Sequence, residues 1–502
     1  MHENIFEHKK NIEMGRRNMK YEDDSLALHT DLYEINMAYT YWKKGIADNN
    51  AVFEVYYREN PFGMGYTIFT GLERIVKYIS NVYFTESDIA YLRDEYDYDE
   101  EFLTYLKEWK FRGTMRAMRE GELAFANEPL VQVEGPILDC QLIETVLLNV
   151  INYQTLIATK GSKVKTAAEG DIVMEFGARR AQEMDASIWG ARAAYIGGVD
   201  STSNTRASKL FDIPASGTHA HALVQAYNDE YEAFKAYAET HKDCVFLVDT
   251  YHSIESGVPT AIRVADEMGD KINFVGVRLD SGDLSYQSKR VRQLLDDAVY
   301  PDAKIFASND LDSDTILSLK MQGAKIDVWG VGTKLITAYE QPALGAVYKI
   351  VMTENKEHEM VPTLKLTANA EKITTPGKKQ VWRIRSNDGK KPEGDLVTLA
   401  HERPDLEDEL FMFHPQYTYI NKTVRDFEAR PLLIEIFDKG ELVYDLPEIE
   451  EIRNYSYEQL SSQYEEHRRI LNPEQYPVDL SQELYDLKMD TIEHFRGLTY
   501  GK

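Results

Sequence analysis

Residues 273–310, NFVGVRLDSGDLSYQSKRVRQLLDDAVYPDAKIFASND, place two apolar runs on either side of a helical pattern. The runs at 273–280 and 304–310 are short and contain Val, Ile and Phe, which is typical of buried strands. Between them, residues 284–298 space their apolar side chains as one face of a helix does. Two strands joined through a helix pair in parallel, so this stretch predicts one unit of a parallel α/β sheet.

The same rhythm fills residues 165–353, where eight strand candidates occur and helical patterns separate most of them. Strands that alternate with helices in this number predict a parallel (β/α)₈ barrel, in a compressed and irregular form. An open doubly wound sheet is the alternative that the pattern leaves. The strand candidates are residues 171–177, 194–200, 212–217, 244–250, 273–280, 304–310, 326–332 and 346–352.

We expect the chain to divide into four segments. Residues 1–24 are charged and form a poorly ordered tail, and residues 25–160 form an N-terminal α/β domain that ends in a long apolar helix. Residues 161–355 form the catalytic α/β barrel. Residues 356–502 form a C-terminal α+β extension, with a hairpin around the turn signal TPGKK at 375–379 and an amphipathic helix near the end.

The charge balance excludes some classes of partner. Lys and Arg number 57 and Asp and Glu number 84, so the formal net charge is −27. Such a chain has no general affinity for nucleic acid or for an anionic membrane, although a local cluster of cations can still bind an anion. The two cysteines, Cys140 and Cys244, form neither a disulfide framework nor a zinc site. With no signal peptide and no apolar run of about 20 residues, we expect a cytoplasmic protein.

Polar residues and glycines follow most of the strand candidates, at the edge where α/β barrels build their active sites. A turn or a helix cap explains each one alone, but their recurrence after successive strands indicates a site. These residues are Arg179, Arg180, Asp200, Ser201, Ser203, His219, His221, Asp249, Arg278, Asp280, Asp283, Asn309, Asp310, Gly330, Gly332 and Thr333.

The types of these residues suggest a phosphorylated sugar and a flat anionic ring as ligands. ASND and GVGT are the last two of these polar loops, and backbone N–H groups in the last loops of such barrels often hold a phosphate. Asp280 and Asp283 suit the vicinal hydroxyls of a sugar or a Mg²⁺ ion. Arg278 lies two residues before Asp280 and therefore points to the same side of its strand. Phe176 stands just before two arginines and offers a flat surface for the ring.

His219 and His221 stand two residues apart, just before a helical pattern. They can be metal ligands, since alternate residues of a strand share a face, although no third ligand stands nearby in the sequence. A histidine can also cap the helix as a purely structural residue. As a third role, an imidazole at a helix start can accept a phosphoryl group, which the positive end of the helix dipole stabilises.

Five motifs occur in order along the chain: FGARRAQ (176–182), GVDSTSN (198–204), GTHAHALVQAY (217–227), GVRLDSGDL (276–284) and GVGTKLITAYEQPALGAVYKIV (330–351). They are preceded by TDLYEINMAYTYW (30–42) and NPFGMGYTIFTGLE (60–73). Over roughly residues 25–430, this set strongly resembles the nicotinate phosphoribosyltransferase family.

The resemblance implies a type II phosphoribosyltransferase fold, an irregular α/β barrel with an N-terminal α/β domain packed on it. It implies that 5-phosphoribosyl 1-pyrophosphate and nicotinate give nicotinate mononucleotide and pyrophosphate, a step of NAD biosynthesis. The family couples this transfer to ATP hydrolysis through a phosphohistidine, and Mg²⁺ is the implied metal ion. A homodimer with active sites shared between the chains is also implied.

The resemblance assigns the phosphate and sugar chemistry to particular residues. His221 closes the GTxxH pattern and is the expected phosphohistidine, whereas His219 occupies a variable position. Thr333 resembles a contact to the phosphoribosyl diphosphate. Asp280 and Asp283 are expected to hold its ribose and Mg²⁺.

Four further residues resemble the contacts to the pyridine ring. Arg278 and Thr218 resemble residues that bind nicotinate. Tyr33 resembles an N-terminal tyrosine that stacks on the ring, and Phe176 is expected on the opposite face. No general base is needed, because the ring nitrogen already has a free lone pair. The enzyme must instead position two anions, neutralise the departing pyrophosphate and exclude water.

Two alternatives remain at this stage. The first is nicotinamide phosphoribosyltransferase, a sister family that has an Asp where this chain has Ser203, although Asp200 nearby makes that alignment arguable. The second is a barrel that binds ligands without catalysis. Intact His221, Asp280 and Thr333 disfavour the second.

Overall fold

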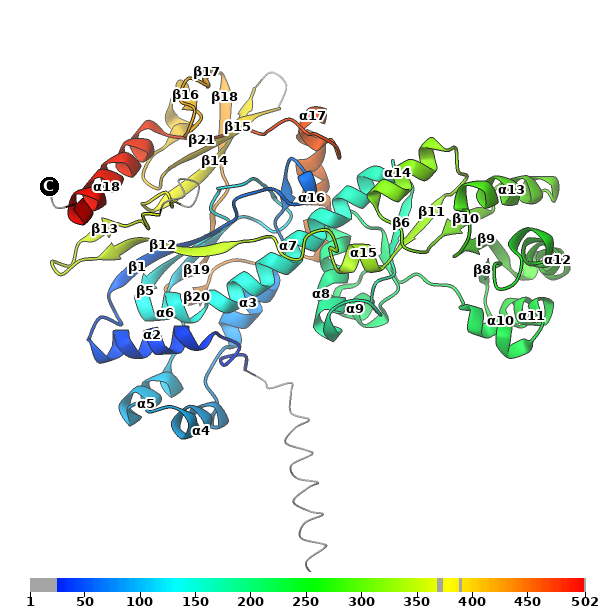
Figure 1. Cartoon of the computed structure of the whole chain (residues 1–502), viewed down its shortest axis with the longest axis horizontal. Coiled ribbons are helices and arrows are strands. Elements are labelled where there is room, and N and C mark those ends of the chain that lie inside the picture. Colours follow the sequence, from blue (N-terminus) through cyan, green and yellow to red (C-terminus); the bar gives the residue numbers. More distant parts are fainter. Residues whose placement is uncertain (1–24, 368–372, 388–390, 501–502) are drawn as a thin grey trace, which may run out of the picture.

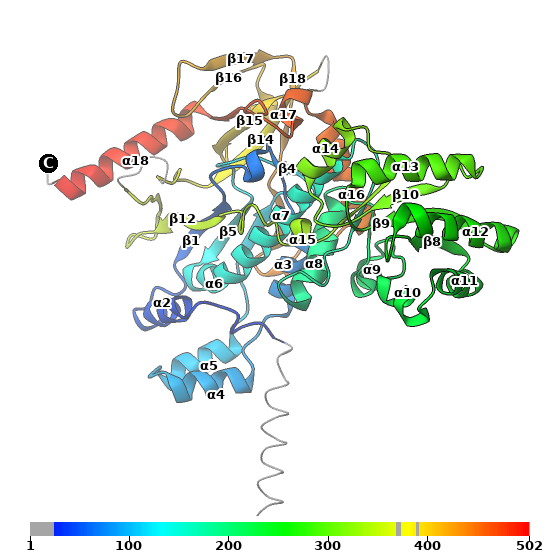
Figure 2. The same cartoon turned by 45° about the vertical axis from the view of Figure 1, so that its right-hand side comes forward.

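A computed structural model of the chain describes residues 25–367, 373–387 and 391–500. The predicted tail at 1–24 lies outside these residues. The structure contains three large sheets and a small ladder of β2 (Thr67–Ile68) and β4 (Leu123–Ala124). Figures 1 and 2 show the long helix α7 (Glu144–Ala167) between the sheet that holds most of the predicted site and the two other sheets.

Six parallel strands form a half-barrel sheet in the order β7, β6, β11, β10, β9, β8. Their side chains are mostly buried, which explains why they appear in the sequence as continuous apolar runs. The strands are β6 (Ile172–Glu175), β7 (Ser201–Thr202), β8 (Asp243–Leu247), β9 (Asn273–Leu279), β10 (Lys304–Ala307) and β11 (Val328–Val331). Their helices are α8 (Glu183–Ile196), α9 (Thr205–Phe211), α10 (His221–Tyr227), α11 (Glu230–Thr240), α12 (Val258–Met268), α13 (Leu284–Asp297), α14 (Ser313–Met321) and α15 (Thr333–Ile336).

The predicted α/β fold class is confirmed, but the eight-strand count is wrong in three places. Residues 194–200 are not a strand, because they contain the end of α8 and the turn after it. Gly197 in this run serves close helix packing, since a Cβ on it would lie 2.1 Å from the backbone oxygen of Ala158 in α7. The short strand β7 begins directly after this turn.

The other two differences concern pairing partners. Residues 212–217 contribute only an isolated bridge between Thr202 and Ala215. Residues 346–352 do form a strand, but it pairs antiparallel with β1 in another sheet. The Tyr348 ring of this strand stacks on Phe53 of β1 with ring centres 4.8 Å apart. An apolar run predicts a strand without specifying which sheet it joins.

The N-terminal sheet has seven antiparallel strands in the order β13, β12, β1, β5, β3, β19, β20. Figure 1 shows helices α2 and α6 on the side of this sheet away from the half-barrel. Its strands are β1 (Asn50–Tyr56), β3 (Thr114–Ala117), β5 (Val131–Pro136), β12 (Val347–Glu354), β13 (Met360–Pro362), β19 (Ile434–Asp438) and β20 (Glu441–Leu442). The helices of this region are α2 (Leu32–Lys43), α3 (Leu72–Asn81), α4 (Glu86–Glu95), α5 (Glu100–Glu108) and α6 (Ile137–Leu142).

The C-terminal sheet has six strands in the order β17, β16, β21, β15, β14, β18. The predicted hairpin around 375–379 is wrong, because β13 and β14 on its two sides belong to different sheets. The predicted terminal helix is confirmed as α18 (Gln482–Tyr500). The strands are β14 (Lys379–Ser386), β15 (Pro392–Leu399), β16 (Glu409–Phe413), β17 (Asn421–Arg425), β18 (Phe427–Pro431) and β21 (Val478–Leu480), and the remaining helices are α16 (Ile449–Ser462) and α17 (Glu465–Arg468).

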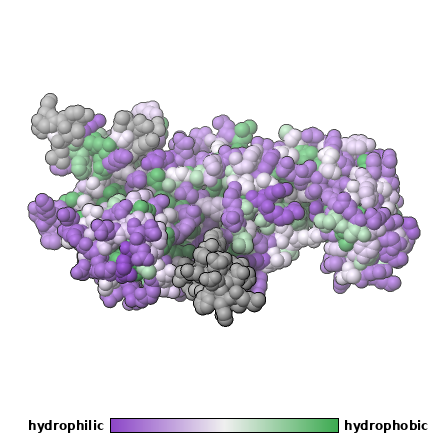
Figure 3. Space-filling model, turned by 60° about the horizontal axis from the view of Figure 1, so that its bottom comes forward, coloured by the Kyte–Doolittle hydropathy of each residue, from purple (hydrophilic) through white to green (hydrophobic). Residues whose placement is uncertain are grey.

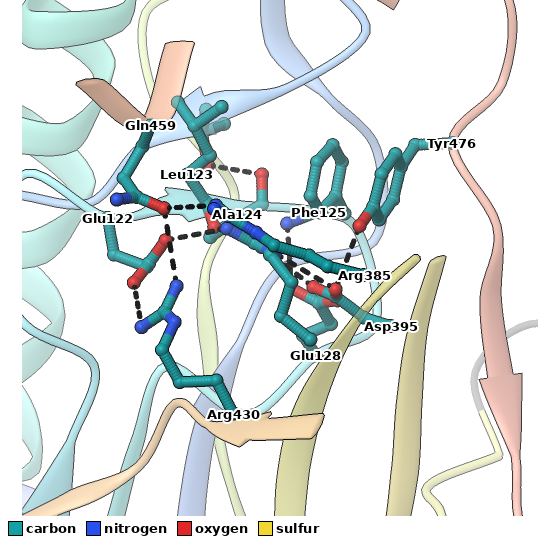
Figure 4. A network of polar contacts seen from close by, with 12 residues as sticks. Glu122, Leu123, Ala124, Phe125, Glu128, Arg385, Asp395, Arg430, Gln459 and Tyr476 are labelled. Atoms are coloured by element: carbon teal, nitrogen blue, oxygen red, sulfur yellow. Dashed lines mark hydrogen bonds and ion pairs between the residues drawn. The ribbon is translucent and has the colours of Figure 1, made fainter. Parts of the chain in front are cut away.

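A buried network of charged side chains joins the C-terminal sheet to the segment around β4 (Figure 4). Arg383 of β14 is fully buried and contacts Glu122 at 2.6 Å and Asp395 of β15 at 2.7 Å. Its guanidinium also donates to the backbone oxygen of Leu123 at 2.8 Å. On the other side of Glu122, Arg430 of β18 contacts the same carboxylate at 2.9 Å.

Two acidic groups of this network have opposite pKa shifts. Burial would raise the pKa of Glu122, but Arg383 and Arg430 hold it below its ordinary value. Glu128 differs, because burial and the neighbouring Asp395 raise its pKa well above the ordinary value. A third arginine, Arg385, lies in the same network and donates to Gln459 at 2.9 Å.

The surface agrees with the composition. The face in Figure 3 is mostly hydrophilic, with smaller hydrophobic patches between the polar areas. Within the described ranges, every helix is too short or too polar to cross a membrane. The segment boundaries at residues 24, 160 and 355 stay predictions.

We expect Arg383→Met to lower the free energy of unfolding by about 3–5 kcal/mol, because it leaves the buried Asp395 without an arginine partner and Glu122 with only Arg430. Arg403→Met is the matched control, since Arg403 pairs with Asp405 at the surface and its side chain is 57% exposed. The control should change stability by no more than about 1 kcal/mol. Urea unfolding of both variants measures the difference, and equal effects would contradict the role of the network.

Candidate active site

Most of the predicted site residues share one edge of the half-barrel sheet. All six strands are parallel, so their carboxyl ends meet at this edge. The residues that follow them there are Phe176 after β6, Ser203 after β7, Asp249 and Thr250 after β8, Asp280 after β9, Asn309 after β10 and Gly332 after β11. The topology thus gathers residues from about 150 positions of sequence at one place.

His221 is the first residue of α10, and its side chain remains 37% exposed. Its Nδ1 lies 3.1 Å from the Thr250 hydroxyl. Its Nε2 faces two carboxylates, Asp280 at 3.8 Å and Asp249 at 4.0 Å. The two ring nitrogens therefore have different surroundings, one neutral and one anionic.

The two carboxylates are held by the loop after β9. One oxygen of Asp249 accepts hydrogen bonds from the Asp280 backbone N–H at 2.8 Å and from the Ser281 hydroxyl at 2.6 Å. The other oxygen of Asp249 is buried and has no hydrogen-bond partner among the described residues. Asp280 accepts a hydrogen bond from the Ser308 hydroxyl. This leaves a buried, unpartnered carboxylate oxygen aimed toward the imidazole.

Arg278 brings a positive charge to the same edge. Its Nη1 donates to the Thr218 hydroxyl at 2.6 Å, and its Nη2 lies 3.7 Å from Asp280. Burial lowers its pKa from the ordinary value, and the nearby Arg179 acts in the same direction. The Nε of Arg278 is buried without a partner among the described residues. A buried guanidinium with an unused N–H group is suited to binding an anionic ligand.

The Phe176 ring lies beside this arginine, with the guanidinium carbon 5.9 Å from the ring centre. The ring rests on Gly330 of β11, where a Cβ atom would come within 2.8 Å of it. A Cβ on Gly332 would lie 3.2 Å from the backbone oxygen of Phe176. Both glycines are therefore explained by the close approach of Phe176 to β11.

His219 does not share the site with His221. Its side chain is 7% exposed and packs against Phe234 and Tyr237. The backbone N–H of Leu247 donates to its Nε2 at 3.1 Å, so Nε2 carries no proton and the ring is neutral. Burial lowers the pKa of His219 to about 4. Of the three roles left open above, the structure supports a structural one for His219.

The loop after β10 has an unusual backbone. Asn309 and Asp310 follow each other with φ angles of 95° and 46°, a region that residues other than glycine seldom adopt. Strain of this kind is frequent at binding sites. On the neighbouring strand, Thr333 is the first residue of α15, directly after Gly332.

Four predicted residues serve other purposes or are exposed to solvent. The Asp283 carboxylate caps α13 by accepting from the Tyr286 N–H at 2.9 Å. Arg179 and Arg180 are exposed in the turn after β6. Asp200 precedes β7 and is bound to Lys165 at 2.7 Å, so it lies away from the strand ends.

Tyr33 is not brought to this edge. It lies on α2 beside the N-terminal sheet, on the far side of α7 from the half-barrel (Figures 1 and 2). Its side chain is 46% exposed. Within one chain it cannot complete the site.

Three residues gain importance from the structure. The sequence placed Asp249 among the residues that follow strands, but nothing in the sequence indicated that it lies close to His221. Thr250 and Ser308 were not predicted, and they contact His221 and Asp280. All three directly follow strands, and this position is the only signal of them in the sequence.

The described residues contain no group of three or more His, Cys, Asp or Glu side chains arranged to hold a metal ion. This does not conflict with the predicted Mg²⁺, because proteins often bind that ion through one or two carboxylates and the phosphates of the substrate. Asp280 fits this pattern, since its carboxylate is partly exposed at the edge. Asp283 fits less well, because one of its oxygens is already bonded to α13.

A site that holds a partly exposed imidazole and a buried cation, at the strand ends of an α/β half-barrel, is typical of enzymes that act on anionic substrates. Three family models match the chain: the nicotinate phosphoribosyltransferase N-terminal domain at residues 28–152, the nicotinate phosphoribosyltransferase family at 172–384 and the nicotinate phosphoribosyltransferase C-terminal domain at 378–488. The chain belongs to the nicotinate phosphoribosyltransferase family of enzymes.

Individual relatives agree with this assignment. Nicotinate phosphoribosyltransferase of Bacillus subtilis (strain 168) is 56% identical over 477 residues, which cover 95% of this chain and 97% of that protein. The crystal structure of human nicotinic acid phosphoribosyltransferase matches with a TM-score of 0.81 and 30% identity, covering 92% of this chain and 99% of that one. Nicotinate-nucleotide pyrophosphorylase from Pyrococcus furiosus matches with a TM-score of 0.67 and 25% identity, covering 88% and 97%.

The lowered pKa of His219 predicts a pH dependence of stability. Its folded-state pKa of about 4 lies below the ordinary 6.5, so its contribution is complete above pH 6.5 and is lost as the pH falls toward 4. Between pH 7 and pH 5, we expect this residue to cost about 2 kcal/mol of unfolding free energy. His219→Gln should remove that part of the decrease, as measured by urea unfolding at both pH values. An identical decrease in both proteins would contradict the neutral, buried role.

Proposed function

We propose that this chain transfers the phosphoribosyl group of 5-phosphoribosyl 1-pyrophosphate to nicotinate, giving nicotinate mononucleotide and pyrophosphate for NAD biosynthesis. We further propose that ATP hydrolysis drives this transfer through a phosphohistidine at His221. The carrying observation is the exposed His221 imidazole at the start of α10, with a hydroxyl on one ring nitrogen and two carboxylates facing the other. Membership of the nicotinate phosphoribosyltransferase family supports the choice of reaction.

The surroundings of the ring favour Nδ1 as the nucleophile. Carboxylates of Asp249 and Asp280 close to Nε2 favour the tautomer that carries its proton there. The lone pair is then on Nδ1, whose neighbour is the Thr250 hydroxyl. This lone pair forms a bond to the γ-phosphorus of ATP while the bond to the bridging oxygen breaks and ADP leaves. Water later cleaves the N–P bond and releases phosphate.

Arg278 and Phe176 suit the nicotinate ring and its carboxylate. The guanidinium has an unused Nε–H, and the Phe176 ring lies next to it. A planar guanidinium can bind a carboxylate through two parallel hydrogen bonds. The same pair would orient the ring nitrogen toward C1 of the sugar. That nitrogen forms the new bond to C1 as the bond from C1 to the pyrophosphate oxygen breaks.

The loops after β10 and β11 suit the phosphates of the sugar substrate. Backbone N–H groups near Gly332 and Thr333 stand where such barrels commonly hold phosphate. Asp280 would hold Mg²⁺ together with the substrate, and when bound that ion neutralises charge on the departing pyrophosphate. Asp283 remains a second candidate ligand through its other oxygen.

The ion pairs of Asp200 favour nicotinate over nicotinamide as the substrate. An amide ligand can use an acidic partner, and Asp200 was the nearest acid to Ser203 in the sequence. In the structure Asp200 is bound to Lys165 and Arg453 and precedes β7, whereas Ser203 is exposed after it. The edge therefore offers Ser203 rather than an acid at this position.

We also propose a homodimer in which Tyr33 of one chain completes the site of the other. This is supported by the distance of α2 from the half-barrel and by the exposure of Tyr33. A two-fold axis would create two equivalent sites, each with Tyr33 from one chain and His221 from its partner.

The proposed reaction is tested with purified protein, 5-phosphoribosyl 1-pyrophosphate, Mg²⁺ and either nicotinate or nicotinamide. We expect mononucleotide from nicotinate, with at least tenfold less from nicotinamide, and faster turnover with ATP. Incubation with γ-labelled ATP should yield acid-labile, base-stable phosphate on the protein, because a phosphohistidine has these properties. His221→Ala should abolish the label, whereas the control His219→Gln should keep it.

Two results would contradict this proposal. Equal use of nicotinamide would overturn the substrate. Label that persists in His221→Ala would overturn the assignment of the phosphohistidine, even if transfer itself continues.

A mixed dimer tests the shared site. Tyr33→Ala and His221→Ala are co-expressed with different tags, and the heterodimer is isolated. If sites are shared, one site carries both substitutions and the other none, so we expect about half of wild-type activity. If each chain uses its own Tyr33, both sites stay damaged, and activity no higher than the mean of the two parent homodimers would overturn the proposal.

A further inference from the structure

A cavity of about 590 Å³ lies between the N-terminal and C-terminal sheets, away from the proposed active site. It is lined by the end of β1, the loop between β4 and β5, the residues before β14, the loop between β16 and β17, strand β21 and helix α18. In Figures 1 and 2 these elements lie on the other side of α7 from the half-barrel. The volume is that of a site for a small organic ligand. We call it the inter-sheet cavity.

The end of the inter-sheet cavity around Lys488 carries an ammonium group with no anionic partner among the described residues. Lys488 of α18 donates to the Thr375 hydroxyl at 3.2 Å, which is its only hydrogen bond within the described part of the chain. An ammonium group has three donors, so two are unused. Burial lowers the pKa of Lys488, and the neighbouring Lys379 adds to this effect.

The groups around Lys488 do not supply the missing anion. Lys379 is the nearest charge, and it is itself paired with Glu54 at 2.8 Å. Thr374, which also lines the inter-sheet cavity, is buried, and its hydroxyl has no partner among the described residues. This end of the cavity therefore offers unused donors around a positive charge.

Strand β21 contributes an acidic side chain, Asp479, to the same cavity. Asp479 lines the inter-sheet cavity and is only 6% exposed, yet its carboxylate makes no hydrogen bond to any described residue. Its one charged neighbour is Lys422, which is already paired with Glu393 at 2.9 Å. Buried carboxylates in proteins are almost always hydrogen-bonded. The Asp479 carboxylate therefore has acceptor sites that a ligand in the cavity could use.

Part of the wall of the inter-sheet cavity is aromatic. Phe125 and Tyr476 stack on each other with ring centres 3.7 Å apart, and both line the cavity. Lys488 and Asp479 do not pair with each other, so neither cancels the charge of the other. The cavity thus combines a cationic end, an acidic group and an apolar wall.

We propose that the inter-sheet cavity is a binding site for a small zwitterionic organic molecule, whose anionic group lies on Lys488 and whose ammonium group lies on Asp479. A simple anion would satisfy Lys488 but leave Asp479 buried without a partner. A simple amine would do the reverse. Only a ligand with both groups, separated by an apolar body, satisfies both side chains.

Isothermal titration calorimetry with a matched set of probes tests this proposal. The zwitterions are 4-aminobutanoate, 6-aminohexanoate and 8-aminooctanoate, and the single-charge controls are hexanoate and hexylamine. We expect at least one zwitterion to bind saturably, with a Kd at least tenfold lower than that of either control. The readout is binding, so its result does not depend on the proposed reaction.

Two substitutions then locate the binding. Lys488→Met should weaken the best zwitterion at least tenfold, and Asp479→Asn should weaken it while leaving hexanoate unchanged. Lys304→Met, at the start of β10 in the half-barrel, is the control and should change nothing. Urea unfolding verifies that each variant is folded. No saturable binding by any zwitterion, binding equal to that of hexanoate, or binding unaffected by both substitutions would overturn the proposal.

Discussion

The fully buried guanidinium of Arg383 is the constraint on which the arrangement of this chain depends. It joins Glu122, from the N-terminal part of the sequence, to Asp395 of the C-terminal sheet, so that two segments more than 250 residues apart share one ion cluster. A charge in this position is tolerable only when every neighbour is in place. The C-terminal sheet is therefore held to the N-terminal part.

The half-barrel edge shows how the proposed chemistry depends on packing. Gly330 lets the Phe176 ring lie against β11, and Thr218 holds Arg278 near that ring. The loop after β9 fixes Asp249 through a backbone N–H, and Asp249 in turn faces His221. Each of these contacts is made by a residue directly after a strand or next to one. The edge can thus be rigid where it orients the imidazole and strained at Asn309 and Asp310, where a phosphate is expected.

The sequence predicted the strands and the edge well, because apolar runs separated by helical patterns leave few arrangements, and polar residues after such runs must meet at one side. It failed where a run could join either of two sheets, as at 346–352, and where glycines looked like a strand end but served helix packing, as at Gly197. The pairing of His221 with Asp249 and Thr250 was not predictable, because it depends on the distance between loops. The sequence did not predict the burial of His219 either, because His221, only two residues further on, is partly exposed.

The return of β12 to the N-terminal sheet also affects the order in which the chain can fold during synthesis. Strands β1, β3 and β5 emerge early, but their outer partners β12 and β19 begin only at Val347 and Ile434. At about 5–20 residues per second, roughly 15–60 s separate β5 from β19 on the ribosome. Until β12 emerges, the three-stranded sheet has two open edges, which are the usual starting points of aggregation, and the β3 edge stays open until β19 follows. The half-barrel, whose strands all lie between residues 172 and 331, can complete its own sheet before either outer partner has been synthesised.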